Sequence, residues 1–320
     1  MRKEPLVSVI IPTYNRAEII CQTIDNVFEQ TYSNFELIVV DDGSADDTQE
    51  KLRAYGGRLR VITQANAGPA VARNRGAAAA RGEIIAFQDS DDSWRPAKLT
   101  RQVALLEKAG DSVPCCLSNA DMGVVNGKAQ TSFGYSLIRP PLEEGLWLNV
   151  GEVLATRFVL FNQTVAIRRA AFEKLGGFDE SLKYLEDYDL PLRLALEGPW
   201  AFINEPLVVY GGVTAGSFSQ RALNDPITLK RCELAIFGKV LARLEGSTRH
   251  TRMQMFLKRR LWRFRQELKE INLQRMNLPA ARSAASLMRK LSHCEDALFR
   301  RSPWFPKVIA EPVEAARLSC

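Results

Sequence analysis

Three carboxylates lie within four residues of one another, directly after a short apolar run. Asp89, Asp91 and Asp92 follow residues 84–87, a run too short for a helix that predicts a buried parallel strand. Ligands bind at the carboxyl edge of such sheets. Neighbouring carboxylates repel one another unless a cation compensates them, and Mg²⁺ or Mn²⁺ takes carboxylate oxygens together with substrate phosphates. An isolated Asp-x-Asp is more often a solvated turn, so the surrounding elements must decide between the two.

The first 109 residues alternate between predicted strands and predicted helices. Such alternation is typical of a Rossmann-like, mostly parallel α/β sheet flanked by helices. Further along we expect more strands within residues 113–165, a helix that follows Glu186 and Asp187 and ends at Gly198, and a final edge strand at 205–210. The early strands are predicted at residues 7–11, 35–40, 60–63 and 84–87, and the early helices at 17–30, 46–55, 70–80 and 97–109.

Polar residues recur at the ends of all four early strands. Asn15 follows the first strand, Asp41 and Asp42 the second, Asn66 the third, and the carboxylate cluster the fourth. The loops after parallel strands share one edge of the sheet, so these side chains are expected to converge. This convergence favours a binding site over four unrelated turns. No G-x-G-x-x-G motif or P-loop follows the first strand, which argues against the usual dinucleotide and triphosphate sites.

Glu186 and Asp187 stand just before a predicted helix. One interpretation is an acidic cap that interacts with the helix dipole. The other is a general base beside a metal and phosphate site, because a carboxylate there can accept a proton from a hydroxyl. The local sequence leaves both interpretations open.

The composition excludes several other classes. Only His250 and His293 are present and the six cysteines show no ligand spacing, which disfavours a histidine zinc site or a Ser-His-Asp triad and predicts reduced thiols. No stretch approaches the roughly 20 apolar residues of a membrane span, and the N-terminus does not resemble a signal peptide. We therefore expect a cytoplasmic protein, either free or peripheral on the cytoplasmic face of the membrane.

Charge divides the chain near residue 220. Residues 1–220 hold 22 Lys and Arg against 28 Asp and Glu, whereas residues 221–320 hold 21 against 9. We expect a first domain at 1–220 and a basic, mostly helical C-terminal region at 221–320. An apolar stripe and many basic residues predict an amphipathic helix within residues 250–275. This helix either packs on the first domain or contacts an anionic membrane surface or acidic partner; nucleic acid is disfavoured because no binding motif accompanies the charge.

Taken in order, the motifs resemble one family. Over roughly residues 6–212 the chain is similar to the family 2 inverting glycosyltransferases with the A-type (GT-A) fold. Each motif is weak alone, but the ordered set is specific. The motifs are Val9-Ile10-Ile11-Pro12-Thr13-Tyr14-Asn15, Val39-Val40-Asp41-Asp42-Gly43-Ser44, Asn66-x-Gly68, Arg73-Asn74-x-Gly76, Asp89-Ser90-Asp91-Asp92, Gly177-Phe178-Asp179 and Glu186-Asp187.

The resemblance implies a nucleotide-sugar site in the early loops. Tyr14 corresponds to a residue whose ring lies against the base, and Asp41 to one that hydrogen-bonds the base. The other positions correspond to further contacts with the nucleotide part of the donor. The donor-binding residues that the resemblance implies are Pro12, Tyr14, Asn15, Asp41, Asp42, Arg73, Asp89 and Ser90.

The resemblance also assigns the metal and the chemistry. Asp91 corresponds to the direct ligand of a Mn²⁺ or Mg²⁺ ion, and Asp89 to a second metal-motif residue that also reaches sugar or ribose hydroxyls. Asp187 corresponds to the general base and Glu186 to its neighbour in the acceptor site. The implied reaction is metal-dependent transfer of a hexose, with inversion, from a nucleotide-sugar, with a UDP-sugar favoured, to an acceptor hydroxyl. The implied acceptor is a saccharide or lipid-linked saccharide in cell-surface polysaccharide synthesis.

Two rival functions and one departure from the family pattern accompany this interpretation. A sugar-nucleotide nucleotidyltransferase would need a glycine-rich loop with a lysine near the first strand, which is missing, and the intact carboxylates argue against a catalytically weakened subunit that binds partners through its basic C-terminal region. Many relatives carry an arginine and a histidine after the last strand, but residues 210–217 hold no histidine. The site would then do without that histidine, or Ser217 or Ser219 would stand in for it. The glycines of this segment predict a loop that closes over the donor.

Overall fold

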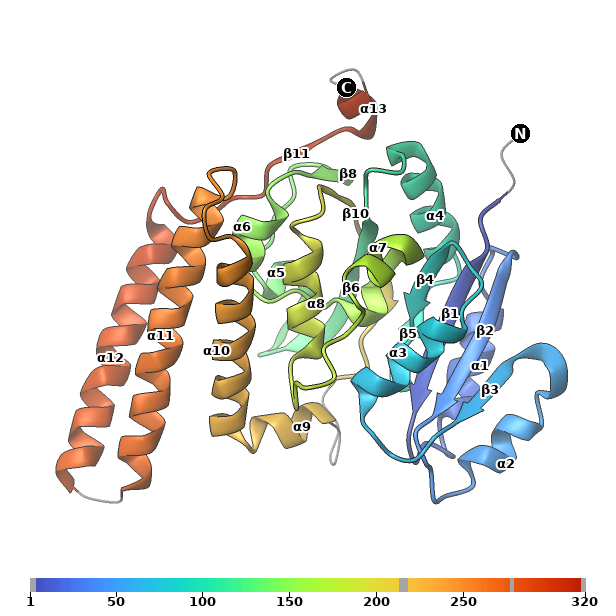
Figure 1. Cartoon of the computed structure of the whole chain (residues 1–320), viewed down its shortest axis with the longest axis horizontal. Helices are drawn as coiled ribbons and strands as arrows, with labels where there is room; N and C mark the ends of the chain where they lie inside the picture. Colours follow the sequence, from blue (N-terminus) through green and yellow to red (C-terminus); the bar gives the residue numbers. More distant parts are fainter. Residues whose placement is uncertain (1–3, 213–217, 277–278, 318–320) are drawn as a thin grey trace.

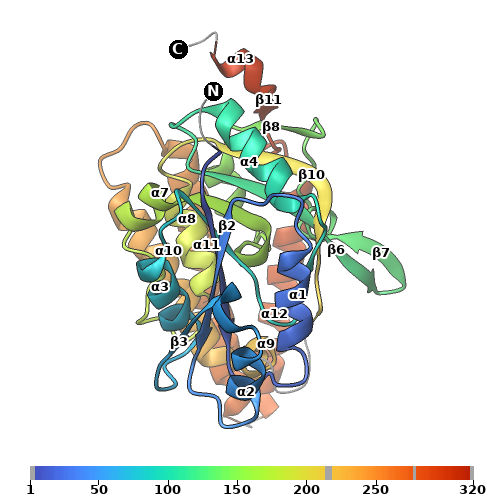
Figure 2. The same ribbon diagram turned by 90° about the vertical axis from the view of Figure 1, so that its right-hand side faces the viewer.

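The structure, a computed structural model, describes residues 4–212, 218–276 and 279–317. A mixed sheet runs through the molecule with helices on both of its faces (Figures 1 and 2). Within these residues the sheet contains 11 strands in the main order β11-β8-β10-β6-β9-β4-β1-β2-β3, with β5 beside β10 and β7 beside β6. The strands are β1 (Val7–Thr13), β2 (Phe35–Asp41), β3 (Arg60–Thr63), β4 (Ile84–Phe87), β5 (Ser93–Trp94), β6 (Cys115–Val125), β7 (Lys128–Thr131), β8 (Glu144–Trp147), β9 (Val165–Arg168), β10 (Trp200–Val209) and β11 (Ala310–Glu311). The α-helices are α1 (Ile20–Phe28), α2 (Thr48–Arg53), α3 (Pro69–Ala79), α4 (Lys98–Ala109), α5 (Ser132–Tyr135), α6 (Val150–Leu154), α7 (Arg169–Lys174), α8 (Glu186–Leu194), α9 (Phe218–Leu223), α10 (Pro226–Arg243), α11 (Thr251–Arg275), α12 (Pro279–Arg301) and α13 (Val313–Arg317).

The first four long strands form the parallel half of the sheet. β1 lies between β2 and β4 and pairs in parallel with both, and β3 continues in parallel on the far side of β2. Both faces of β1 and β4 are buried under helices, which is why these strands read as nearly unbroken apolar runs. The predicted α/β class, with a mostly parallel sheet flanked by helices and a helical C-terminal extension, is confirmed. All five cysteines of the described residues are free thiols.

Side chains along the buried strands alternate between two apolar cores. In β4, Ile85 and Phe87 belong to the core that also contains side chains of α3, α8, α10 and α11, whereas Ile84 and Ala86 face the core under α1 and α4. Fully burying one such aliphatic or aromatic side chain stabilises the fold by about 1.5–3 kcal/mol. The first of these cores is continuous from the sheet into the C-terminal helices, so α10 and α11 are built onto the sheet through shared apolar contacts.

The predicted edge strand at 205–210 is wrong in both extent and position. β10 begins at Trp200 and lies inside the sheet, parallel to β6 and antiparallel to β8. Its register against β6 shifts between Ile203 and Val208, where residues 204–206 interrupt the apolar alternation. This interruption hides the first half of the strand from a search for apolar periodicity. Two further differences are helices α5 and α6 among the strands expected before residue 165, and β9, which the pattern does not predict.

The apolar stripe of α11 faces the protein interior. Phe256, Leu257, Leu261 and Phe264 are buried in the core shared with the sheet. Of the alternatives drawn from the sequence, packing on the first domain therefore holds for this part of the helix. Contact of the helix with an anionic membrane surface or an acidic partner stays a prediction. Among the described residues, none of the helices combines the length and the apolar character needed to cross a bilayer. After α12 the chain returns to the sheet, where β11 pairs with β8.

Candidate active site

The loops after β1 and β2 are tied to each other at the carboxyl edge of the sheet. The backbone N–H of Asn15 donates to Ser44 Oγ at 2.9 Å, and the N–H of Ala45 donates to Asn15 Oδ1 at 2.8 Å. Asn15 has φ of 51°, in the left-handed region that asparagine tolerates better than most residues. These contacts fix the turn that carries Tyr14, which is 40% exposed, just beyond the half-buried Pro12.

Asp41 and Asp42 follow one another at the end of β2, and both are buried. Asp41 accepts hydrogen bonds from Ser44 N at 3.0 Å and from Gln49 Nε2 at 2.8 Å. Asp42 accepts from two backbone N–H groups in the loop before α3, each at 2.8 Å. Asp42 therefore positions that loop, and a direct contact between its carboxylate and a nucleotide would compete with these bonds.

Arg73 joins two acids that lie far apart in the sequence. Its Nη2 donates to Asp89 Oδ1 at 2.5 Å, and its Nη1 donates to Glu186 Oε1 at 2.9 Å. Burial alone would lower the pKa of Arg73, but the charges of Asp89 and Glu186 outweigh burial and raise it. The charged guanidinium thus fixes the loop after β4 against the start of α8, and it brings three predicted site residues together.

Glycines set the distance between α3 and the turn before α8. Asn74 Nδ2 donates to the carbonyl of Phe178 and Asn74 Oδ1 accepts from its N–H, both at 2.9 Å. A Cβ on Gly177 would approach Asn74 Oδ1 to 2.5 Å, and its φ of 71° also favours glycine. A Cβ on Gly76 would lie 2.5 Å from the side chain of Ile10, so this glycine lets α3 pack closely on β1. Close packing therefore accounts for the glycines at positions 76 and 177 of the two motifs.

The loop after β4 carries carboxylates that lack enough positive partners. Within the described parts of the chain, Asp91 makes no ion pair and no hydrogen bond to another residue. Burial and then the charge of Asp89 raise the pKa of Asp91, while Arg16 opposes the shift. Burial also raises the pKa of Asp92 well above its ordinary value, and Asp89 and Asp91 add to this shift. The loop is therefore short of positive charge.

Contacts on two sides hold this acidic loop in place. Asp92 Oδ1 accepts from the backbone N–H of Gly211 at 2.7 Å, and Thr23 Oγ1 of α1 donates to the carbonyl of Ser90 at 2.7 Å. A Cβ on Gly211 would lie only 1.9 Å from the carbonyl oxygen of Asp91, so no side chain fits there. Asp92 and Gly211 are absent from the donor-binding, metal and catalytic residues that the family resemblance implies. The sequence signals that could have indicated them are the run of acids at 89–92 and the two glycines that follow β10.

Asp187 lies in the first turn of α8, half-buried beside the other acids. Burial raises the pKa of Asp187 to about 7, Glu186 and Asp89 add to the shift, and Arg73 opposes it. In the described part of the chain no side chain caps the start of α8, which follows Leu185 in a left-handed conformation with φ of 67°. The Glu186 carboxylate binds Arg73 instead. Asp187 can therefore change protonation near neutral pH, which is the property that a general base requires.

Tyr210 is a further member of this site that the sequence did not indicate. It follows β10 directly, and its backbone N–H donates to the carbonyl of Asp121 at 2.9 Å. Burial, followed by the charges of Asp92 and Asp91, raises the pKa of Tyr210 to about 12. Its hydroxyl therefore stays protonated beside the acids and can donate a hydrogen bond at neutral pH.

The segment after Gly212 holds the positions where many relatives carry a histidine and this chain does not. Residues 213–217 lie outside the described residues, and so does the side chain of Ser219. The proposed substitutes Ser217 and Ser219 and the predicted closing loop therefore stay predictions.

The acidic loop fits a divalent cation. Asp91, a carboxylate without a partner among the described residues, stands beside Asp89, and such oxygen-rich negative surroundings are what Mg²⁺ and Mn²⁺ select. Within the described ranges, no group of three or more His, Cys, Asp and Glu side chains forms a candidate metal cage. A cation here would rely on one or two carboxylates together with phosphate oxygens of a bound ligand.

An open pocket of about 500 Å³ lies between the start of α3 and Glu186. It is bordered by Asn66 and Gly68 in the loop after β3, by residues 180–183, and by Glu186. The structure thus brings the third predicted loop, through Asn66, to the same edge as the acids. Space for a ligand lies directly beside the Arg73–Glu186 ion pair.

A mostly parallel sheet with acids and a buried arginine at its carboxyl edge defines an α/β protein with a ligand site that suits a phosphate-bound cation. Comparison with protein families names the family. Residues 8–175 match the model of Glycosyl transferase family 2, more than half of the chain, and the chain belongs to that family.

Individual relatives agree with this assignment. An uncharacterized glycosyltransferase of Rickettsia typhi is 34% identical over 210 residues, which cover 64% of this chain and 63% of that protein, less than two thirds of its length. Among solved structures, Staphylococcus aureus TarS 1–349 in complex with UDP-GlcNAc matches 87% of this chain and 78% of its own, with a TM-score of 0.64 and 21% identity. The mannosyltransferase PcManGT of Pyrobaculum calidifontis, in complex with GDP-Man and Mn²⁺, matches 95% of this chain and 83% of its own, with a TM-score of 0.55 and 23% identity. At such identities the two structures establish the shared GT-A fold.

Proposed function

We propose that this protein is an inverting, metal-dependent glycosyltransferase that moves a hexosyl group from a nucleotide-sugar to an acceptor hydroxyl. The observation that carries the proposal is the placement of Asp187, whose pKa is raised to about 7, beside an acid pair ordered by Arg73. Membership of the family supports glycosyl transfer. The UDP-GlcNAc and GDP-Man complexes of the two structural relatives support a nucleotide-sugar as donor.

In the proposed reaction Asp187 is the general base. Its carboxylate accepts the proton of the acceptor hydroxyl while the hydroxyl oxygen attacks the anomeric carbon of the donor sugar. The new bond joins that oxygen to the anomeric carbon, and the bond from the anomeric carbon to the diphosphate oxygen breaks. The nucleoside diphosphate leaves with the electron pair. Attack comes from the face opposite the leaving group, so a single displacement inverts the configuration.

The remaining acids and Arg73 hold and order the donor. Asp91, with Asp89, would hold Mn²⁺ or Mg²⁺, and the bound cation would offset the charge of the diphosphate as it leaves. Arg73 keeps Asp89 and Glu186 in place, which spares both from moving when the donor binds. Tyr14 and Asp41 at the far side of this edge are proposed to contact the base.

The proposed donor is a UDP-sugar, and the proposed acceptor is a saccharide or lipid-linked saccharide of a cell-surface polysaccharide. The UDP-GlcNAc complex of TarS supports UDP, whereas the GDP-Man complex of PcManGT makes GDP the alternative to test. Glu186 is placed beside the proposed base and next to the open pocket, so we assign it to positioning the acceptor.

The test needs no knowledge of the acceptor, because water can take its place. The protein is incubated with UDP-sugars and GDP-sugars in the presence of Mn²⁺, and the released sugar is followed by proton NMR from the first minutes. An α-linked donor should release the β-anomer first. Initial release of the α-anomer would contradict inversion.

Two controls separate the parts of this proposal. Asp187→Asn should stop sugar release while nucleoside diphosphate binding persists, because only the proton acceptor is removed. Asp111→Asn, at an acid whose side chain is 74% exposed, should leave release unchanged. Absence of release and of nucleoside diphosphate binding for every donor would instead favour the catalytically weakened subunit.

A further inference from the structure

The helix α12 is the outermost element of the C-terminal region. Figure 1 shows α10 and α11 between α12 and the sheet, and the first turns of α12 at the same end of the molecule as the carboxyl ends of β1 and β2. Phe256 of α11 packs edge-on against Phe299 of α12, with ring centroids 6.1 Å apart. Beyond α12, Asn149 Nδ2 donates to the carbonyl of Lys307 at 2.7 Å. The helix is thus anchored along one side and just beyond its C-terminal end.

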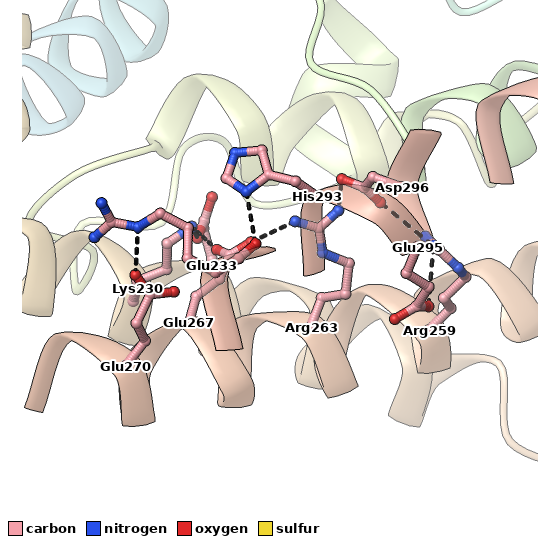
Figure 3. Close-up of polar contacts among 10 residues, drawn as sticks. Lys230, Glu233, Arg259, Arg263, Glu267, Glu270, His293, Glu295 and Asp296 are labelled. Atoms are coloured by element: carbon pink, nitrogen blue, oxygen red, sulfur yellow. Dashed lines mark hydrogen bonds and ion pairs between the residues drawn. The ribbon is translucent and has the colours of Figure 1, made fainter. Parts of the chain in front are cut away.

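The helices α11 and α12 form a helical hairpin, and all of its acids take part in ion pairs (Figure 3). Residues 251–309 contain 14 Lys and Arg but only four Asp and Glu. Every one of these four acids pairs with a basic side chain of α10, α11 or α12. The pairs are Glu267 with Lys230 and Arg263, Glu270 with Arg289, Glu295 with Arg259, and Asp296 with Arg259 and Arg263.

The outer side of α12 carries an apolar stripe. Leu287, Leu291 and Leu298 are 59%, 62% and 70% exposed, and their spacings of four and seven residues place them on one face of the helix. Trp304, just after the helix, is 63% exposed. We call the three leucine side chains the α12 stripe, and Trp304 follows it along the chain. Large apolar side chains gathered in this way on a surface mark an interaction site.

The charges around the α12 stripe are basic. Lys290 and Arg301 are exposed and lie three residues beyond Leu287 and Leu298, next to the stripe on the helix surface. The exposed side of α11 adds Lys258, Arg265 and Lys269, and the acids of the hairpin are all bound in its interior pairs. Among the described residues, no acid forms an ion pair with these five basic side chains, so the surface combines apolar side chains with positive charge.

We propose that the α12 stripe docks on an anionic lipid bilayer. Leucine and tryptophan side chains enter the headgroup boundary while lysine and arginine at their flanks meet lipid phosphates, which is the chemistry of an interfacial amphipathic helix. A second copy of the chain would bring two basic surfaces together, which repel one another. A nucleic acid would satisfy the charges but not the leucines. This docking goes beyond the proposed reaction and does not depend on it.

The test is co-sedimentation of the full chain with vesicles of phosphatidylcholine alone or mixed with phosphatidylglycerol, without donor or metal. The natural protein should bind the mixed vesicles, and added salt should weaken the binding. Leu287→Ser combined with Leu291→Ser should lower the partition constant by about tenfold or more. Lys290→Gln with Arg301→Gln should lower binding to the mixed vesicles severalfold. Val124→Ser, at a residue 74% exposed on the β6–β7 hairpin, should change nothing.

Several outcomes would overturn the proposal. One is the absence of binding to the mixed vesicles; another is equal binding by the leucine variant. If light scattering shows a dimer that the leucine variant converts to a monomer, without vesicle binding, the stripe serves self-association. If the protein ignores vesicles but binds an oligonucleotide in fluorescence anisotropy, the surface serves nucleic acid. Because neither assay needs turnover, these outcomes are separate from failure of the proposed glycosyl transfer.

Discussion

Two groups of acids in this protein meet opposite electrostatic surroundings. At the carboxyl edge of the sheet, Asp91, Asp92 and Asp187 have too few positive partners, and burial raises the pKa of each. In the helical hairpin, burial would also raise the pKa of Glu267, but Lys230 and a neighbouring arginine outweigh burial and lower it. The acids of the helical hairpin thus have their cations within the chain. The acids proposed to serve catalysis leave that compensation to a ligand.

The largest effect on this difference is expected from Asp187→Asn. The amide cannot accept a proton, so nucleoside diphosphate release from the donor should fall by about 10²–10⁴-fold. Binding of the nucleoside diphosphate, measured by calorimetry, should change little. Asp111→Asn is the matched control, and near-normal turnover by Asp187→Asn would remove Asp187 from the mechanism.

The same variant should be more stable than the natural protein, but only at high pH. The folded-state pKa of Asp187, about 7, lies above its ordinary value of 3.8, so folding favours the protonated form. That contribution is complete below the ordinary value and is lost as the pH rises through about 7. Because Asp187 is partly exposed, we expect a gain of only about 1 kcal/mol at pH 8 and none at pH 4, measured by urea unfolding.

Turnover of the natural protein should follow the ionisation of Asp187. The base works only when it is ionised, so kcat/KM should fall about tenfold for each pH unit below about 7. The measurement is donor turnover between pH 5 and 8.5 at constant ionic strength. A flat profile across this range would contradict the assignment of Asp187 as the base.

A smaller effect is expected where the acidic loop meets the end of β10. In Gly211→Ala the new Cβ would meet the carbonyl oxygen of Asp91 at 1.9 Å, so the loop must move. We expect Mn²⁺-dependent binding of UDP to weaken by about tenfold, since a displacement of about 1 Å at such a site has effects of this order or larger. Gly57→Ala, where nothing lies within 4 Å of the added Cβ, should bind normally. Equal affinity in both variants would show that the loop tolerates the shift.

The smallest effect is expected in the helical hairpin. Glu267→Gln removes the pairs with Lys230 and Arg263 and should cost about 1–2 kcal/mol of stability at pH 7, with turnover unchanged. The pKa of Glu267 is lowered from 4.5, so its stabilisation is present above that value and is lost as the pH falls below it. Urea unfolding should therefore separate the variant from the natural protein at pH 7 and bring them together in acid. Glu245→Gln, at an exposed acid, is the control.

Local patterns predict the parallel half of the sheet well. The run at 84–87 and its carboxylates form β4 and the acidic loop as expected, because an apolar run covered on both faces has few alternatives. The pattern fails at β10, where residues 204–206 shift the register. It also cannot decide what an amphipathic helix faces. The stripe of α11 is buried, whereas the exposed stripe lies on α12, and only the packing of the two helices distinguishes them.

The site residues show the same limit. Motifs identify Arg73, Asp89 and Glu186, but the ion pairs that join them depend on a contact across 113 residues of sequence. Motifs also place Asp42 with the nucleotide contacts, which stays a prediction, but they do not indicate that its carboxylate binds the loop before α3. Residue type and position in a motif predict which chemistry is available. Which partner each polar atom takes is decided by the tertiary fold.

A cation site at the sheet edge is tested most directly by calorimetric titration of UDP, with and without Mn²⁺, into the natural protein, Asp91→Ala and the control Glu245→Ala. GDP and dTDP serve as rival nucleotides. If the acids at the sheet edge await a cation brought with the ligand, UDP should bind only with Mn²⁺, and Asp91→Ala alone should lose this binding. Equal binding without Mn²⁺, or equal binding by Asp91→Ala, would show that these acids do not bind a cation together with the nucleotide.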